Sequence, residues 1–306
     1  MKEPRVAIII LNWNGYQVTK DCLTSLFNID YQEYIVTLVD NGSKDKSVEK
    51  LKTDFSTEKK LNFLILDKNH GFTGGNNRGL EFASSEFSPD YYLLLNNDTI
   101  VTKDFLGFMV NASQKDVNCY AVVPKILYHD MPQKIWFAGG QISKLTGVVK
   151  HFGLNKKDVA QYDLSKRTGF MNGCCALISK NAITEIGILD DQFFANSEDA
   201  DYSLRIIESG HTIQYTSQAI IYHKVSHSFK SNKGKWLAFY LAARGIVLLQ
   251  KKHLSKRQLP IFYAVFSIRW VMYLTIKLLL LNDIESIKGI YKGTFDGIRN
   301  RIRFVV

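Results

Sequence analysis

The sequence predicts an α/β protein built on a doubly wound, mostly parallel sheet. Strand-like and helix-like segments alternate through the first hundred residues, which is the order that such a sheet requires. Polar residues gather directly after the predicted strands, and open α/β sheets bind ligands at the carboxyl ends of their strands. The chain has 306 residues, 46% of them hydrophobic, which suits one large α/β domain or a domain with a smaller appendage.

The alternation is visible as apolar runs separated by polar turns. Residues 6–11 form a continuous apolar run, as in a parallel strand that is buried on both faces. Residues 71–79 are glycine-rich, and they suit either a backbone cradle for a phosphate or sugar or an ordinary loop of several turns. The expected elements are, in order, strand 6–11, helix 18–27, strand 35–39, a helix from residue 47, strand 63–66, the glycine-rich stretch and strand 91–95.

The chain between residues 120 and 250 is less regular. Gly210 stands where a glycine would end a helix that begins at Glu198. The expected elements are a mixed, partly antiparallel region over 120–180 with a strand ending at 177–179, helix 198–208, short strands at 213–215 and 220–222, and helix 234–250. We expect one domain over residues 1–230, divided into 1–100 and 101–230, and a helical extension over 231–306.

Cysteine usage and the N-terminus bear on where the chain works. Four cysteines are too few for a disulfide scaffold, and because no CxxC pair occurs, a structural zinc site is not expected. A reducing cytosol fits this usage best. The first apolar run is about six residues long, shorter than the core of a signal peptide, so we interpret it as a strand.

The charge is concentrated at the C-terminal end. The net charge is +10, but residues 224–306 alone carry +13 and the rest of the chain −3. A segment this basic favours polyanions, either nucleic acid or anionic lipid head groups. No recognisable nucleic-acid module surrounds the basic residues, so nucleic acid is not an expected partner.

The hydrophobic pattern of this basic segment favours lipid. Residues 261–281 are long enough to cross a bilayer, but Arg269 and Lys277 interrupt them. At about 100° per residue, these two cations share a face with Tyr273, while Trp270 falls elsewhere. We expect an amphipathic helix in the plane of an anionic membrane surface; the alternative is a helix packed on the protein's own core.

Polar clusters after the strands supply the candidate binding residues. Asp40, after the second strand, could accept hydrogen bonds from a base or ribose, or simply form a turn. Asn96, Asn97 and Asp98 follow a strongly hydrophobic strand, and Asp98 could hold Mg²⁺ or Mn²⁺ on a diphosphate. The alternative for this cluster is a strand-to-turn signal.

Further along, Glu198, Asp199 and Asp201 open the predicted helix. Acidic residues in a first turn suit the helix dipole, but three in four residues exceed that need, and one could be a general base. His223 and His227 follow the last predicted strand, and a metal role for a histidine there becomes more plausible beside a second ligand such as Asp98.

Together, the order and spacing of these pieces resemble the family 2 glycosyltransferases, which have the GT-A fold. The matching pieces are IIILNWNG, LVDNGSKDKS, NHGFTGGNNRG, LLLNNDTIV, GILDDQFFANSEDADYSLR and IYHKVSHS, in family order over about three quarters of the chain. The third and fourth pieces look most like the rhamnosyltransferase-like branch.

The resemblance implies a role for each matching residue. It makes 1–100 the nucleotide-binding half of the domain and 101–230 the acceptor and catalytic half. Asp199 matches the catalytic base of the family's ED motif, and Asp98 and His223 match its metal site, where Asn96 replaces the first Asp of DxD and adds no negative charge. The donor-binding residues would be Asn12, Asp40, Gly75, Asn76, Asn96 and Asn97, and the acceptor side would hold Gly173, Cys174, Phe194 and Glu198.

The activity implied by the resemblance is inverting transfer of a sugar from a nucleoside diphosphate donor, such as dTDP-rhamnose or a UDP-sugar. The acceptor would be a saccharide or a lipid-linked saccharide at the cytoplasmic face of the membrane, in cell-surface polysaccharide synthesis, with Mn²⁺ or Mg²⁺ on the donor. Two other function classes are a sugar nucleotidyltransferase, which would want a Gly-rich basic loop after the first strand, and a non-catalytic nucleotide-sugar or membrane-binding module.

Overall fold

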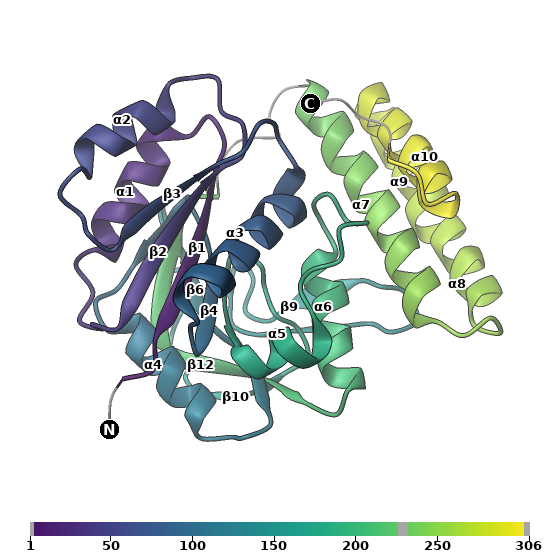
Figure 1. The fold of residues 1–306 in the computed structure, drawn as a ribbon. Helices are drawn as coiled ribbons and strands as arrows, with labels where there is room; N and C mark the ends of the chain where they lie inside the picture. The colour runs from purple at the N-terminus through teal and green to yellow at the C-terminus, as the bar shows by residue number, and fades with distance from the viewer. Residues whose placement is uncertain (1–2, 226–231, 303–306) are drawn as a thin grey trace.

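The computed structural model describes residues 3–225 and 232–302. Its main feature is a ten-stranded mixed sheet in the order β10-β12-β6-β11-β4-β1-β2-β3, with β5 paired to β12 and β7 to β6 (Figure 1). The strands are β1 (Val6–Asn12), β2 (Tyr34–Asp40), β3 (Leu61–Ile65), β4 (Tyr91–Asn96), β5 (Thr99–Val101), β6 (Cys119–Tyr128), β7 (Ile135–Phe137), β8 (Gly140–Ile142), β9 (Val149–His151), β10 (Lys166–Thr168), β11 (Cys175–Ser179) and β12 (Thr212–His223).

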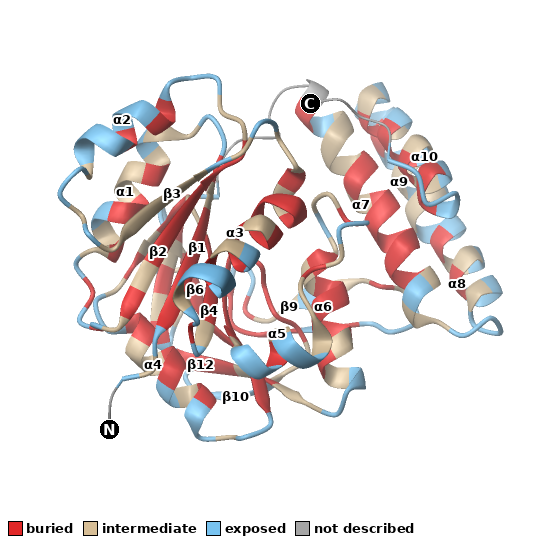
Figure 2. Cartoon of the chain, viewed as in Figure 1, coloured by how far each residue is buried: buried red, intermediate tan, exposed pale blue. Residues whose placement is uncertain are grey.

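Helices cover the sheet and extend beyond it at the C-terminal end. They are α1 (Tyr16–Leu26), α2 (Ser47–Asp54), α3 (Gly71–Phe87), α4 (Phe105–Gln114), α5 (Lys180–Ile186), α6 (Glu198–Glu208), α7 (Asn232–His253), α8 (Leu259–Phe266), the π-helical turn η1 (Ser267–Met272), α9 (Tyr273–Leu280) and α10 (Ile284–Ile298). The central strands and the inward turns of α3, α6 and α7 are buried, whereas α8 to α10 carry much exposed surface (Figure 2).

The first half is the predicted doubly wound sheet. Strands β3, β2, β1 and β4 are parallel neighbours, and the chain reverses its direction of progress across the sheet at β1. Because βαβ crossovers are right-handed, α1 and α2 lie on one face and α3, which carries the chain back past β1, on the other. The switch between β1 and β4 leaves a crevice at their carboxyl ends.

The glycine-rich stretch is the first half of α3, so the expectation of a loop there was wrong. A Cβ at Gly75 would overlap the side chain of Leu11, and one at Gly79 would lie 2.6 Å from Ile9 Cγ2. These glycines let the helix lie directly on strand β1. Their spacing therefore serves helix-to-sheet packing, which loop-like composition concealed.

The second half is mixed, as predicted, and it returns the chain to the crevice. Strand β11 is antiparallel to both β4 and β6. The two short strands expected at 213–215 and 220–222 are one long strand, β12, with an irregular register between Thr216 and Ile220. Beyond that irregularity β12 pairs with β5, which carries its end to the residues that follow β4.

The C-terminal helices form a separate layer with a small core of its own. Phe262 and Phe266 of α8 pack against Ala243, Ile246 and Val247 of α7. Helix α10 lies along α7, and its glycines at residues 289, 293 and 297 face α7. A Cβ at residue 293 would overlap the backbone carbonyl of residue 240.

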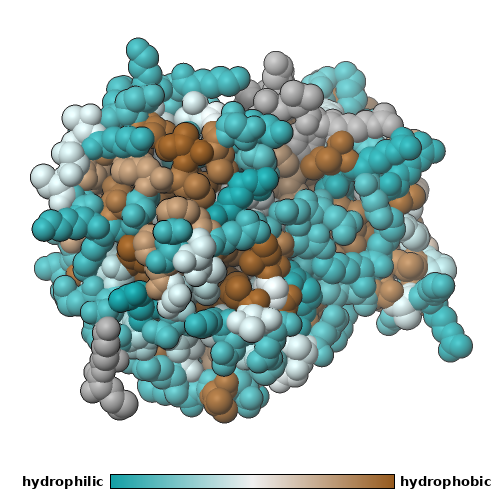
Figure 3. Space-filling model, in the orientation of Figure 1, coloured by the Kyte–Doolittle hydropathy of each residue, from teal (hydrophilic) through white to brown (hydrophobic). Residues whose placement is uncertain are grey.

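The outer side of this layer is apolar and open. Among the described residues, the continuous helix Leu259–Leu280 is long and apolar enough to cross a membrane by length and composition, and its most apolar part is only 11% buried. One face packs on α7, while Ile268, Met272 and Leu280 are 63%, 58% and 81% exposed. Figure 3 shows hydrophobic residues between hydrophilic ones over these helices, at the right of the view.

The glycine contact between α10 and α7 leads to a stability prediction. Gly293→Ala should destabilise the protein by about 1–3 kcal/mol, because the methyl group forces the two backbones apart. Gly107→Ala in α4 is the matched control; no atom lies within 4 Å of its Cβ position, so we expect a stabilisation of about 0.5–1 kcal/mol. Urea denaturation measures both, and equal effects of the two variants would contradict the packing.

Candidate active site

A cavity of about 2230 Å³ opens at the carboxyl ends of β1 and β4 and continues to the C-terminal helices. Nine of the residues singled out in the sequence line it. The end of β4 and the turn after it supply Asn96, Asn97 and Asp98, and the segment before β11 supplies Gly173 and Cys174. Phe194 comes from the segment before α6, Glu198 and Asp199 from the first turn of α6, and His223 from the end of β12. The fold thus brings together residues that are up to 127 positions apart.

Asp98 and His223 form an ion pair on the cavity wall. The antiparallel pairing of β5 with β12 sets Thr99 opposite His223, which places the imidazole beside the preceding carboxylate. Nε2 of His223 lies 3.1 Å from Oδ1 of Asp98. Burial disfavours the imidazolium, but the Cys174 sulfur and the Asp98 carboxylate favour it, and the balance raises the pKa of His223 to about 10.

Asp199 is the cavity-lining carboxylate that is ionised near neutral pH without a cationic partner. Its Oδ1 accepts a hydrogen bond from the backbone N–H of Ala200 at 2.8 Å, and its Oδ2 accepts one from Gly173 at 3.3 Å. Burial raises the pKa of Asp199 to about 6, against these two hydrogen bonds, which lower it. A pKa near neutrality is what a general base requires.

Glu198, next to it, behaves differently. Its side chain is buried, and its pKa is raised well above the usual range, first by burial and then by the charge of Asp199. Of the two neighbours, Asp199 is therefore the one that more readily holds the negative charge of the pair.

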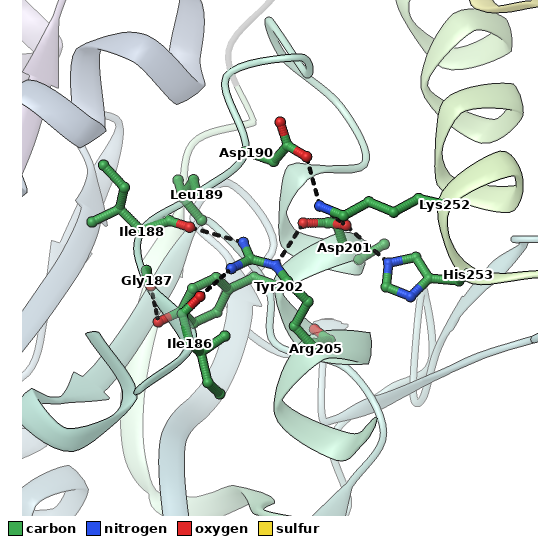
Figure 4. A network of polar contacts seen from close by, with 12 residues as sticks. Ile186, Gly187, Ile188, Leu189, Asp190, Asp201, Tyr202, Arg205, Lys252 and His253 are labelled. Carbon is green, nitrogen blue, oxygen red and sulfur yellow. Dashed lines mark hydrogen bonds and ion pairs between the residues drawn. The ribbon is translucent and has the colours of Figure 1, made fainter. Parts of the chain in front are cut away.

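The third carboxylate of this turn, Asp201, anchors α6 to α7 (Figure 4). It is fully buried, and its oxygens lie 2.9 Å from Nε of Arg205, Nζ of Lys252 and Nε2 of His253. Burial raises the pKa of Asp201, but the three cations outweigh it and lower the pKa. Because α7 also carries part of the cavity wall, this cluster sets the first turn of α6 relative to that wall.

Four predicted donor residues, Asn12, Asp40, Gly75 and Asn76, do not line the cavity. Nδ2 of Asn12 donates to Oδ1 of Asp40 at 2.9 Å, and both side chains are at most 3% exposed. Asn76 donates to the carbonyl oxygen of Phe72 and is also buried. In this structure these polar groups join the ends of β1 and β2 and the first turns of α3 to one another, and they do not face the cavity.

The structure adds cavity residues that sequence reasoning missed. Asn41, the residue that follows Asp40, lines the cavity, whereas Asp40 does not. Successive residues along an extended chain point in different directions, which explains the difference. Trp13 is 47% exposed beside it, and its place directly after the first strand was the available signal. Trp136 of β7 packs edge-on against His223, with ring centroids 4.6 Å apart, and no sequence pattern indicated it.

The polar end of the cavity suits a divalent cation that arrives with an anionic ligand. Asp98 supplies an oxygen ligand, His223 supplies a nitrogen ligand once a cation displaces its proton, and Asn96 and Asn97 supply amide oxygens nearby. Within residues 3–225 and 232–302, no group of three or more His, Cys, Asp or Glu side chains could hold a metal. A cation here would need ligands from the bound molecule, as Mg²⁺ commonly has. His227 lies outside the described residues.

Comparison with known proteins places this geometry in a family. The model of "Glycosyl transferase family 2" matches residues 7–187. The low-salt glycan biosynthesis hexosyltransferase Agl10 of Haloferax volcanii is 25% identical to this chain, and the match covers 97% of this chain and 92% of Agl10.

Solved structures share the fold. A crystal structure of GalNAc-T7 with UDP, GalNAc and Mn²⁺ superposes with a TM-score of 0.66 at 15% identity, over 85% of this chain and 50% of that one. The mannosyltransferase PcManGT of Pyrobaculum calidifontis, in complex with GDP-Man and Mn²⁺, superposes with a TM-score of 0.59 at 12% identity, over 98% and 89%. These likenesses confirm the predicted GT-A-like fold with a mixed sheet and C-terminal helices.

Proposed function

This chain belongs to glycosyl transferase family 2, and from that premise we propose that it is an inverting hexosyltransferase that takes its sugar from a nucleoside diphosphate donor. The acceptor is a hydroxyl of a saccharide or lipid-linked saccharide in the synthesis of a cell-surface glycan. One observation carries the proposal: Asp199, with a pKa of about 6, shares a single cavity with the Asp98–His223 pair.

The chemistry follows from the two ends of the site. An acceptor hydroxyl hydrogen-bonded to Asp199 attacks the anomeric carbon, and the proton passes to the carboxylate as the bond to the nucleoside diphosphate breaks. Burial and the charge of Asp199 raise the pKa of Glu198, so we assign the base of this pair to Asp199. A single displacement with one base inverts the anomeric centre.

The donor's diphosphate belongs at the other end. The amide groups of Asn96 and Asn97, which line the cavity, suit phosphate oxygens. A divalent cation held by Asp98 and His223, when bound, would neutralise the charge of the leaving diphosphate. The base and sugar of the donor remain open: the rhamnosyl-like pieces favour a dTDP-sugar, whereas GalNAc-T7 and PcManGT were solved with UDP and GDP-Man.

The protein is proposed to work at the cytoplasmic face of the membrane, as a peripheral protein. Two observations support this: the +13 charge of residues 224–306 and the exposed apolar face of Leu259–Leu280. Basic residues attract anionic head groups, and apolar side chains enter the interface beneath them. Lys277, 58%-exposed Ile276 and Leu280 lie on this outer side.

The first prediction concerns the base. Asp199→Asn should lower kcat by about 10²–10⁴-fold, because the acceptor proton has no recipient, while nucleotide binding is retained. Since the pKa of Asp199 is raised to about 6, kcat/KM of the wild type should fall about tenfold per pH unit below pH 6 and level off above it.

Glu86→Gln, an exposed acid at the far end of α3, is the control for this substitution and should keep full activity. Unchanged transfer in Asp199→Asn would refute the assigned base. Absence of activity in the wild type with every donor tried would favour a non-catalytic nucleotide-sugar-binding module.

The second prediction concerns the donor and the cation. A thermal-shift panel of UDP, dTDP and GDP, each with and without Mn²⁺, should show one nucleotide whose stabilisation grows with the cation. A ligand at 100 times its Kd adds about 2.7 kcal/mol. Asp98→Asn should remove the cation-dependent part alone, because it removes the carboxylate ligand. Equal cation dependence in Asp98→Asn would contradict the assigned metal position.

The third prediction concerns the membrane. The double substitution Ile276→Glu and Leu280→Glu should abolish flotation of the protein with vesicles that contain 30% anionic lipid, because two charges enter the apolar face. Val117→Glu is the control, since Val117 is 91% exposed but lies before β6, away from these helices. Flotation that survives the double substitution would refute this docking face.

A further inference from the structure

The cavity is larger than a sugar donor needs. Ligand sites for small molecules occupy roughly 300–1,000 Å³, whereas this cavity has about 2230 Å³. Part of this room is lined by the C-terminal helices. Its wall there is made by α7, the π-helical turn and the helices that follow: Gly234, Trp236, Leu237, Leu241, Ala242, Ile246, Arg269, Trp270, Tyr273, Leu274 and Glu285.

This wall is apolar and aromatic with one cation. Leu237 and Leu241 of α7 and Leu274 of α9 supply aliphatic surface, and Trp236 and Trp270 supply broad rings. Trp270 is backed by a parallel stack on the Phe266 ring, and Trp236 by one on Tyr240, so both indoles are held in place. Such a surface accepts a hydrocarbon chain or the flat face of a sugar ring.

Arg269 is the single lysine or arginine that lines the cavity within the described part of the chain. Its side chain is exposed and makes no hydrogen bond or ion pair with any described residue. Glu285 also lines the cavity, but Lys288 lies 2.7 Å from its carboxylate and offsets its charge. An unpaired guanidinium beside apolar side chains suits a phosphate oxygen of a partly apolar ligand.

Arg269 and Trp270 stand in the π-helical turn Ser267–Met272, which forms part of this wall. Such turns occur frequently at functional sites. Regular α spacing would group Arg269 and Tyr273 with Lys277. In the structure, Arg269 and Tyr273 line the cavity with Trp270 and Leu274, while Lys277 does not.

We propose that this end of the cavity binds the phosphate and the first part of the hydrocarbon chain of a lipid-phosphate-linked acceptor, with Arg269 on the phosphate. The proposal rests on the transferase function above and names its acceptor class. The acceptor's sugar then extends toward Asp199 along the same cavity, and its chain leaves beside the exposed apolar face of Leu259–Leu280. That continuity selects a lipid phosphate over a free anion.

The test uses the full-length protein and binding alone, so it needs no transfer activity. The probe is decyl phosphate below its critical micelle concentration. Decanol has its hydrocarbon chain without the phosphate, and inorganic phosphate has the anion without the chain. In titration calorimetry, we expect decyl phosphate to bind at least tenfold more tightly than decanol or inorganic phosphate. Arg269→Gln should raise its Kd about ten- to hundredfold, and Arg269→Lys should lie between, since it keeps the charge and loses the planar fork.

Lys277→Gln is the matched control, because Lys277 is a cation of the same helix that does not line the cavity. Its Kd should stay within twofold of the wild type. An unchanged Kd for decyl phosphate in Arg269→Gln would overturn the site. An equal rise of this Kd in Arg269→Gln and Lys277→Gln would also overturn it, because it would indicate general attraction to a basic surface. Inorganic phosphate that binds as tightly as decyl phosphate would overturn the lipid assignment in favour of a free-anion site.

The outcome is separable from that of the proposed function. Nucleotide stabilisation in the thermal-shift panel should be the same in Arg269→Gln as in the wild type, which also shows that the variant is folded. Loss of decyl phosphate binding with intact nucleotide binding supports the acceptor site. Failure of the transferase proposal would appear in the donor panel and in Asp199→Asn, whatever the probe does.

Discussion

The structure depends on how three carboxylates in the first turn of α6 are compensated after burial. Asp201 is balanced by three basic side chains, two of them from α7, and its pKa is lowered. Burial and the charge of Asp199 disfavour the ionised form of Glu198. Asp199 accepts hydrogen bonds from the backbone N–H groups of Gly173 and Ala200, and burial raises its pKa to about 6. The same turn thus contains an anchor, a carboxyl group that disfavours its charge and the proposed base, because each carboxylate meets a different environment.

The site is assembled from elements that meet only in the folded sheet. The return of β12 beside β5 delivers His223 to Asp98, and the antiparallel β11 sets Gly173 and Cys174 beside the end of β4. Helix α7 closes the far side and is tied to α6 through Asp201. The reacting end is therefore built by the sheet, and the surrounding wall by the C-terminal layer. Under the proposed function, the donor end lies at the sheet and the acceptor end at the C-terminal helices.

Sequence reasoning succeeded where one local signal dominated. The helix 198–208 was predicted with its observed bounds, since acidic residues begin it and Gly210 follows it. It failed where tertiary contacts decide. The glycines of α3 have a loop-like composition but serve contact with β1. Asp40 and Asn41 are adjacent, and only the fold shows which one faces the cavity. Trp270, which periodicity placed on another face, lines the cavity together with Arg269 and Tyr273.

The glycine contact between α10 and α7 also bears on how such a protein diversifies. Where two backbones touch, no side chain can be enlarged by degrees to tilt one helix against the other. The crossing of these helices is therefore fixed by backbone contact. If the proposed acceptor site is correct, its side chains on the π-helical turn and α9 can be exchanged singly to suit another acceptor while the scaffold around them stays the same.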